Sequence, residues 1–87
     1  MSFAQKKARL TWHCRRGMLE LDLLLTRFMA RHFDTLDTHQ VEALEVLLGY
    51  SDPDLYALLM GHEQATDQGI ADIVSFIRLQ NHTEAFA

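Results

Sequence analysis

Apolar residues recur every three or four positions along almost the whole chain, which is the spacing of one face of an α-helix. No segment shows the alternation of apolar and polar residues that marks a β-strand. Breaks in the pattern separate five segments, at about residues 3–14, 18–32, 38–48, 53–60 and 70–81. The sequence therefore predicts an all-α protein of about five helices packed as a compact bundle. The second segment has the widest apolar stripe, so we expect it to be the central helix.

Short polar patterns mark where three of these segments begin or end. Ser2 with Gln5, and Asp37 with Gln40, have the spacing of a capping box, in which two side chains satisfy free N–H groups at a helix start. Gly17 lies between the first two segments and can adopt the left-handed conformation that ends a helix. We therefore place the first bend of the chain at Gly17.

The fourth segment opens with Asp52-Pro53-Asp54. Asp52 is expected to be the N-cap of this helix, because a carboxylate there accepts hydrogen bonds from free N–H groups. Pro53 suits the first turn, where its missing N–H leaves no hydrogen bond unmade. Asp54 adds a second negative charge near the positive end of the helix dipole. Helix capping accounts for all three residues.

Two carboxylates at the start of the second helix should have different roles. At ~100° per residue, Asp22 falls on the apolar side of the helix and Glu20 on the opposite side. A carboxylate on a buried face is unfavourable unless it is hydrogen-bonded or paired, so we expect Asp22 to cap or to pair within the fold, with Arg15 and Arg16 as candidate partners. Glu20 should point outward, where nothing in the fold obviously requires it.

At 87 residues the chain is long enough for one small domain, which we place at 1–87. The ordered core is expected at about residues 3–81, followed by a frayed tail from His82. With Cys14 as the one cysteine, no internal disulfide can form, and we expect a reduced, partly buried thiol. The longest apolar run, Leu23-Leu24-Leu25, is far too short for membrane insertion. The N-terminus lacks a signal peptide's apolar core, so the expected location is the bacterial cytoplasm.

Charge is distributed unevenly along the chain. Residues 1–31 carry seven of the eight Lys and Arg with two carboxylates, whereas residues 32–87 carry one Arg with ten carboxylates. On the first helix, Lys6, Arg9, His13 and Arg16 form a basic stripe. The stripe has two readings at this stage: a solvated face, or a surface that binds an anion or an acidic partner. The uneven charge of the whole chain could steer a partner to one face, or it could reflect helices of opposite sign packed side by side.

Known catalytic and metal-binding motifs are absent from the sequence. The five histidines lack H-x-x-x-H spacing, and there is no P-loop and no G-x-S-x-G. A bundle of this length also offers little volume for a substrate pocket. Taken alone, the residues indicate a small helical interaction module, with no catalytic residue singled out and no metal site expected, although their types leave Ser/His/Asp or paired-carboxylate catalysis open.

One longer stretch is more specific. Arg15-Arg16-Gly17-Met18-Leu19-Glu20-Leu21-Asp22 is followed by Phe28, by Phe33-Asp34 and by Asp52-Pro53-Asp54-Leu55-Tyr56. In order and spacing, from about residue 7 to 60, this pattern resembles the SdhE family, the flavinylation or assembly factors of succinate dehydrogenase. The resemblance implies a five-helix bundle that binds the FAD-containing flavoprotein subunit of succinate dehydrogenase, and often of fumarate reductase. It also implies that the protein promotes covalent attachment of FAD to a histidine of that subunit.

The resemblance also assigns site residues. The family's Arg-Gly-x-x-Glu motif falls on Arg16, Gly17 and Glu20. The partner-binding residues it implies are Arg15, Arg16, Gly17, Met18, Glu20 and Asp22, with Asp52, Pro53 and Asp54 as a secondary contact. FAD would belong to the partner, so the chain is expected to have no cofactor of its own and to be an assembly factor that is monomeric when free.

The basic first helix supports one alternative from another class. In it, the chain is a small regulatory or antitoxin-like protein that uses Lys6, Lys7, Arg9, Arg15 and Arg16 to bind nucleic acid or another protein. The net charge of −4 argues against nucleic acid, because single domains that bind it usually have a strong basic excess. No nucleic-acid partner is therefore expected. A small enzyme ranks third, and turnover by the isolated chain would support it.

Overall fold

The structure is a bundle of α-helices joined by short connections. The computed structural model describes the backbone of residues 2–85 and the side chains of residues 2–81. In chain order the elements are α1 (Phe3–His13), α2 (Leu19–His32), the 3-10 turn η1 (Phe33–Thr35), α3 (Thr38–Leu47), α4 (Asp52–Leu59) and α5 (Gln68–Ala85). No β-strand occurs between residues 2 and 85. The prediction of an all-α, single small domain with about five helices is confirmed.

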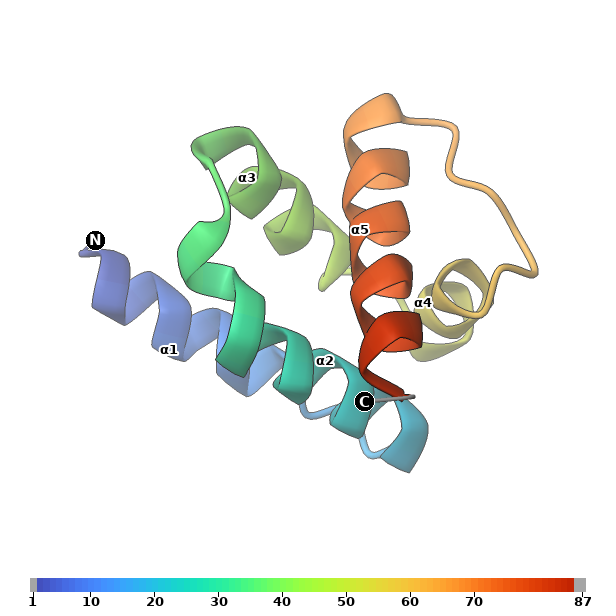
Figure 1. Cartoon of the computed structure of the whole chain (residues 1–87), viewed down its shortest axis with the longest axis horizontal. Coiled ribbons are helices and arrows are strands. Elements are labelled where there is room, and N and C mark those ends of the chain that lie inside the picture. The colour runs from blue at the N-terminus through green and yellow to red at the C-terminus, as the bar shows by residue number, and fades with distance from the viewer. Residues whose placement is uncertain (1, 86–87) are drawn as a thin grey trace.

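The helices pack around α5, which contacts α2, α3 and α4. In Figure 1, α1 and α2 lie together along the lower edge of the molecule, with α3 and α5 above them and α4 beside α5. The last helix, α5, packs most extensively against α3 and also contacts α4 and α2. The expectation that the second helix is central was therefore wrong. Its apolar stripe is wide because α2 contacts α1 and η1 as well as α5.

The core is purely apolar over the part of the chain whose side chains are described. No polar or charged side chain is buried there. Every helix contributes to the core, and its most deeply buried large side chains include Leu10, Leu21, Leu25, Phe33, Leu44, Leu55, Ile73 and Ile77. Polar contacts between helices therefore lie at the edges of the bundle.

Local capping sets two helix starts as predicted. The Ser2 hydroxyl accepts a hydrogen bond from the Gln5 N–H at 3.2 Å, and the Asp37 carboxylate accepts one from the Gln40 N–H at 2.8 Å. The glutamine side chain of each pair accepts a hydrogen bond in return, which completes both capping boxes. The starts of α1 and α3 are therefore specified by residues within one turn of each helix.

The predicted cap of α4 was wrong. Ser51, with extended φ/ψ, is the N-cap, and its hydroxyl accepts a hydrogen bond from the Asp54 N–H at 3.3 Å. Asp52 is the first residue inside the helix, and Pro53 lies in the first turn as expected. The carboxylate of Asp52 is not needed as a cap because Ser51 supplies one, and it pairs instead with Arg16.

The last helix is longer than expected. Its backbone is helical to Ala85, beyond residue 81, where the ordered core was expected to end. Residues 82–85 contain no glycine or proline that would stop the helix. Residues 86–87 of the expected tail lie outside the described residues. None of the helices described between residues 2 and 85 has the length and apolarity needed to cross a membrane.

Candidate functional site at the α1–α2 turn

The turn between α1 and α2 carries the predicted motif. Gly17 has φ +80°, and this left-handed conformation reverses the chain where the bend was predicted. A Cβ atom built on Gly17 would meet no other atom within 4 Å. The glycine is therefore required by its backbone conformation and not by close packing inside the fold, and the space in front of it is open.

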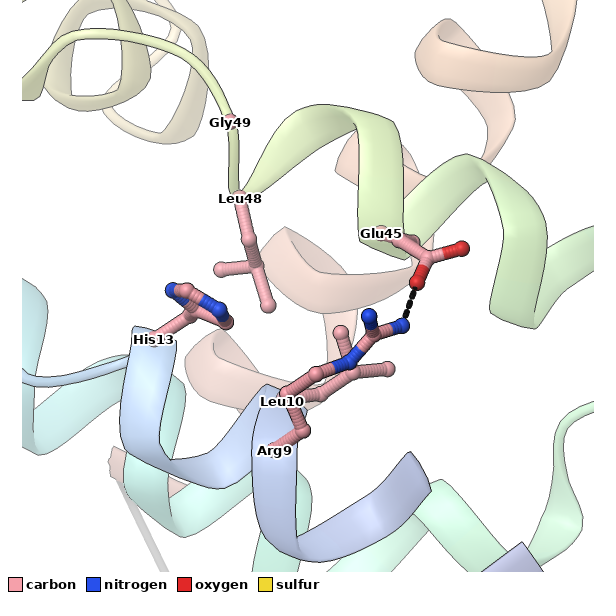
Figure 2. Close-up of a pocket in the computed structure, with 6 residues that line it drawn as sticks. All are labelled: Arg9, Leu10, His13, Glu45, Leu48 and Gly49. Atoms are coloured by element: carbon pink, nitrogen blue, oxygen red, sulfur yellow. Dashed lines mark hydrogen bonds and ion pairs between the residues drawn. The ribbon is translucent and has the colours of Figure 1, made fainter. Parts of the chain in front are cut away.

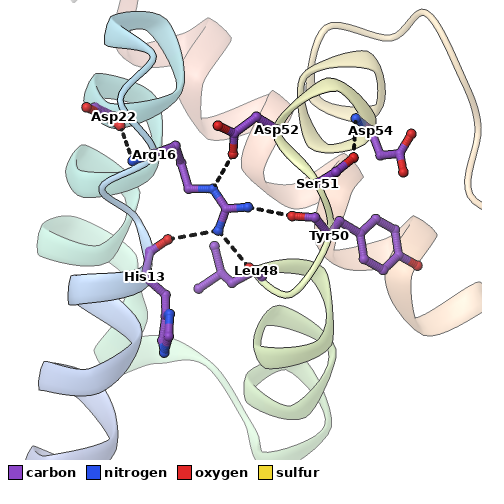
Figure 3. Close-up of polar contacts among 8 residues, drawn as sticks. All are labelled: His13, Arg16, Asp22, Leu48, Tyr50, Ser51, Asp52 and Asp54. Atoms are coloured by element: carbon purple, nitrogen blue, oxygen red, sulfur yellow. Dashed lines mark hydrogen bonds and ion pairs between the residues drawn. The ribbon is translucent and has the colours of Figure 1, made fainter.

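The side chain of Arg16 fixes the turn to the rest of the bundle (Figure 3). Its Nε donates a hydrogen bond to the Asp52 carboxylate at 2.8 Å. Its Nη1 donates to the Leu48 carbonyl at 2.7 Å and to the His13 carbonyl at 3.2 Å, and its Nη2 donates to the Tyr50 carbonyl at 2.5 Å. Only 14% of the side chain is exposed. Arg16 thus joins the end of α1 to the α3–α4 connection and the start of α4.

Asp22 fixes the same turn from the opposite side. Its Oδ1 accepts a hydrogen bond from the backbone N–H of Arg16 at 2.6 Å. The prediction that Asp22 caps or pairs within the fold is confirmed, and its partner is the main-chain N–H of Arg16 and not the guanidinium. The backbone of the turn is therefore tied to α2, and its arginine side chain is tied to α3 and α4.

Glu20 is exposed on the first turn of α2, as predicted. Its carboxylate nevertheless has a neighbour in the fold, which the sequence analysis missed. The negative charge of the nearby Glu20 carboxylate raises the pKa of Tyr56. Tyr56 is the aromatic residue at the end of the Asp52–Tyr56 stretch. The one sequence signal for Tyr56 is its place in the pattern that resembles the SdhE family.

The remaining motif residues differ in their exposure. Arg15 is exposed, and its guanidinium carbon lies 5.7 Å from the centre of the Trp12 ring, within cation–π range. Met18 is half-buried, packs against the core and is the N-cap residue of α2. Arg15 is therefore available for contact at the surface, whereas Met18 mainly supports the start of the helix.

The start of α4 lies beside the turn between α1 and α2. Residues 15–22 and 52–56, the two parts of the pattern that resembles the SdhE family, are therefore neighbours in space. Asp52 contacts Arg16 across 36 positions of sequence, and Tyr56 contacts Glu20. Pro53 and Asp54 are exposed on the first turn of α4. The structure thus brings the primary and secondary candidate residues to one end of the bundle.

Most of the basic stripe on α1 is paired within the fold. Lys6 and Arg9 both form ion pairs with Glu45 of α3, the first at 3.7 Å, and Arg16 pairs with Asp52. The packing of oppositely charged helices, which the sequence left open for the chain as a whole, therefore accounts for these three cations of the stripe. His13, the other member of the stripe, is exposed.

A small cavity lies next to the Arg9–Glu45 pair, between α1 and the end of α3 (Figure 2). Its lining residues are Arg9, Leu10, His13, Glu45, Leu48 and Gly49, and its volume is about 130 Å³. Pockets that enclose small molecules have volumes of roughly 300–1,000 Å³. This cavity is therefore too small for a substrate or a flavin.

Cys14 is fully buried, with its thiol 3.3 Å from the Leu10 carbonyl, so it lies deeper than the partial burial expected from the sequence. Burial raises the pKa of Cys14 to about 12, which keeps the thiol protonated and unreactive at neutral pH. Among the described residues, no three His, Cys, Asp or Glu side chains gather in a way that could hold a metal ion.

The chain is similar over most of its length to proteins of one family. The family model described as "Flavinator of succinate dehydrogenase" (Sdh5) matches residues 8–82. A protein named FAD assembly factor SdhE from Legionella pneumophila (strain Paris) is 54% identical over 74 residues, which cover 85% of this chain and 92% of the relative. The protein of the same name from Vibrio cholerae serotype O1 is 42% identical over 81 residues, covering 93% and 94%. The solution structure of a UPF0350 protein superposes with a TM-score of 0.80 at 40% identity, covering 97% of this chain and 89% of that one.

Proposed function

Because this chain belongs to the family of succinate dehydrogenase flavinators, we propose that it binds the flavoprotein subunit of succinate dehydrogenase and promotes covalent attachment of FAD to it. Its relatives are named FAD assembly factors, and the motif residues of the resembling pattern lie together in this fold. A second partner in this proposal is the flavoprotein subunit of fumarate reductase, to which FAD would be attached in the same way. FAD stays with the partner, the chain carries no cofactor of its own, and the free chain is a monomer.

The observation that carries this proposal is an exposed turn held in one conformation from two sides. Arg16 and Asp22 fix its backbone to three helices, while Glu20 and Gly17 remain exposed. A preordered loop loses little conformational freedom when it binds, so more of its contact energy appears as affinity. The open space in front of Gly17 allows the backbone of a partner to approach closely.

The proposed contribution of this protein to the reaction is orientation. Bound through Glu20 and the turn, the flavoprotein subunit is held in a conformation in which its histidine meets the flavin methyl group. Correct placement of two reacting groups can lower a barrier by several kcal/mol without any added acid or base. The bond-forming chemistry then belongs to the partner, and this chain acts as an assembly factor.

The nucleic-acid alternative loses most of its supporting feature in this arrangement. Of its five cations, Lys6, Lys7, Arg9 and Arg16 are paired with carboxylates of η1, α3 and α4, whereas Arg15 forms no ion pair within the described part of the chain. A phosphate backbone would have to compete with these internal pairs. No contact in the described part of the chain favours nucleic acid over a protein partner.

Flavin fluorescence of the denatured flavoprotein subunit, read in a gel, tests the proposed function. Cells lacking this protein are rescued with the wild type, with Glu20→Ala, or with Glu42→Ala, a matched control that removes an exposed carboxylate from α3. The wild type and Glu42→Ala should restore covalent flavin and Glu20→Ala should not, with helicity and solubility unchanged in both variants. Equal covalent flavin in every strain, including the one that lacks this protein, would refute the proposal.

A further variant separates the two contacts of Glu20. Tyr56→Phe keeps the aromatic ring and removes only the hydroxyl whose pKa the Glu20 carboxylate raises. If Glu20 acts on the partner, Tyr56→Phe should retain flavinylation while Glu20→Ala loses it. Equal loss in both variants would instead assign the role of Glu20 to its interaction with Tyr56.

A further inference from the structure

The face of α1 that points away from the bundle is apolar and uncovered. Ala4, Ala8 and Trp12 follow one another at intervals of one helical turn on this face, opposite the buried side chains of Leu10 and Cys14. Trp12 is 68% exposed, although tryptophan is usually well buried. These residues form part of a shallow depression lined by Ala4, Lys7, Ala8, Thr11, Trp12 and Arg15. We refer to this depression as the α1 outer face.

The α1 outer face is continuous with the turn that carries the motif. Arg15 belongs to both, because it directly precedes Arg16 in the sequence and its guanidinium lies 5.7 Å from the centre of the Trp12 ring. This cation–π contact orders two long side chains at the surface. A protein that binds the turn at Gly17 and Glu20 therefore has an apolar surface next to its first contact.

Charge distinguishes Arg15 from its neighbours on α1. Lys6 and Arg9 pair with Glu45, and Lys7 pairs with Asp34 at 3.0 Å. Within the described part of the chain, Arg15 forms no ion pair with a carboxylate. The α1 outer face thus combines an apolar stripe with a cation whose charge is not neutralised by the fold.

From these observations, and resting on the proposed function, we propose that the α1 outer face is a second docking surface for the flavoprotein subunit, which binds there through an apolar segment that carries an acidic side chain. Apolar residues of that segment pack on Trp12, and its carboxylate pairs with Arg15. The small side chains of Ala4 and Ala8 allow the backbone of the segment to approach the helix. Tryptophan and arginine are the residue types most often found to dominate binding energy at protein interfaces.

A spectroscopic label tests this proposal in the unmutated chain. Trp12 is the single tryptophan of the sequence, so incorporation of 5-fluorotryptophan gives one ¹⁹F resonance. Addition of the purified, unlabelled flavoprotein subunit should shift this resonance and make it insensitive to the exchange of H₂O for D₂O, because the ring leaves water. A complex that forms while the resonance keeps its free position and its solvent sensitivity would overturn the proposal.

Binding constants of variants provide the second test. Trp12→Ala should weaken binding to the flavoprotein subunit about tenfold or more, and Arg15→Gln should weaken it in the same direction. The matched control is Val46→Ala, which shortens a side chain that is 56% exposed on α3 and should bind like the wild type. Circular dichroism of each variant confirms that the helices are retained.

The outcomes separate this inference from the proposed function. If the wild type binds and Trp12→Ala binds equally well, the second docking surface is wrong and the proposed function stands. If the wild type does not bind the flavoprotein subunit, both proposals fail. A concentration-dependent dimer that Trp12→Ala abolishes would show that the α1 outer face takes a second copy of this chain, and it would overturn the proposal.

Discussion

Replacement of Arg16 by alanine should destabilise the whole bundle. The substitution removes four hydrogen bonds, one to the Asp52 carboxylate and three to the carbonyls of His13, Leu48 and Tyr50. A hydrogen bond to a charged group contributes ~1.5–3 kcal/mol to stability, but bonds made by one side chain are not additive. Because 37% of the Asp52 side chain is exposed, water can replace part of what is lost. We therefore expect a loss of about 2–4 kcal/mol.

This loss is large for a domain of this size. Small proteins have unfolding free energies of roughly 0.05–0.15 kcal/mol per residue, so a chain of 87 residues is expected to have about 4–13 kcal/mol in total. Urea denaturation followed by circular dichroism measures the effect. With a slope of ~1–3 kcal/mol per molar urea, the midpoint of Arg16→Ala should fall by at least about 0.7 M.

The neighbouring arginine provides the matched control. Arg15→Ala removes the same side chain from an exposed position, where the contact with Trp12 is worth about 0.5–1 kcal/mol. Arg16→Lys keeps the charge but cannot reproduce the forked pattern of donors, so its stability should lie between those of Arg16→Ala and the wild type. Equal urea midpoints for Arg15→Ala and Arg16→Ala would refute the structural role given to Arg16.

Two further predictions concern the residues on either side of these arginines. Gly17→Ala should lower the free energy of unfolding by about 1–2 kcal/mol in the same urea assay, because φ +80° is unfavourable for alanine. The loss should not be larger, because the added Cβ atom meets no other atom within 4 Å. A larger loss would indicate a steric conflict that this structure does not contain. Burial raises the pKa of Cys14 from 9.0 to about 12, so the folded state favours the neutral thiol. The contribution of this thiol to the free energy of unfolding is therefore complete below pH 9 and is lost as the pH rises toward 12. Cys14→Ala should therefore show a flatter fall in stability than the wild type between pH 9 and 12, and parallel curves would contradict the raised pKa.

The positions of the helices could be predicted because their signals are local. Each helix buries residues at helical spacing, and the boxes Ser2–Gln5 and Asp37–Gln40 act within a single turn. The start of α4 shows where local signals become ambiguous. Ser51 and Asp52 are adjacent and both are good N-cap residues. Their roles are decided by Arg16, which lies 36 positions earlier in the sequence and pairs with Asp52.

The side-chain contacts of the candidate site were only partly predictable for the same reason. Helical periodicity could place Asp22 inward and Glu20 outward, because both directions are properties of α2 alone. It could not reveal that Tyr56 lies beside Glu20, since that contact depends on how α4 packs. Likewise, the sequence could place Lys6 and Arg9 on one stripe but could not identify Glu45 of α3 as their common partner.

The motif at the α1–α2 turn combines residues that support the fold with residues that face solvent. Arg16 and Asp22 use their polar groups inside the molecule, whereas Gly17 and Glu20 remain exposed on the loop that those contacts hold. Under the proposed function, the two groups depend on each other, because exposed residues bind most tightly when the loop that carries them is already ordered. A loss of flavinylation on changing Arg16 therefore arises through the stability of the turn, and the same loss on changing Glu20 arises at the surface of a protein that remains folded. The close spacing of these residues follows directly: the side chains that order the turn must lie within a few positions of those it presents.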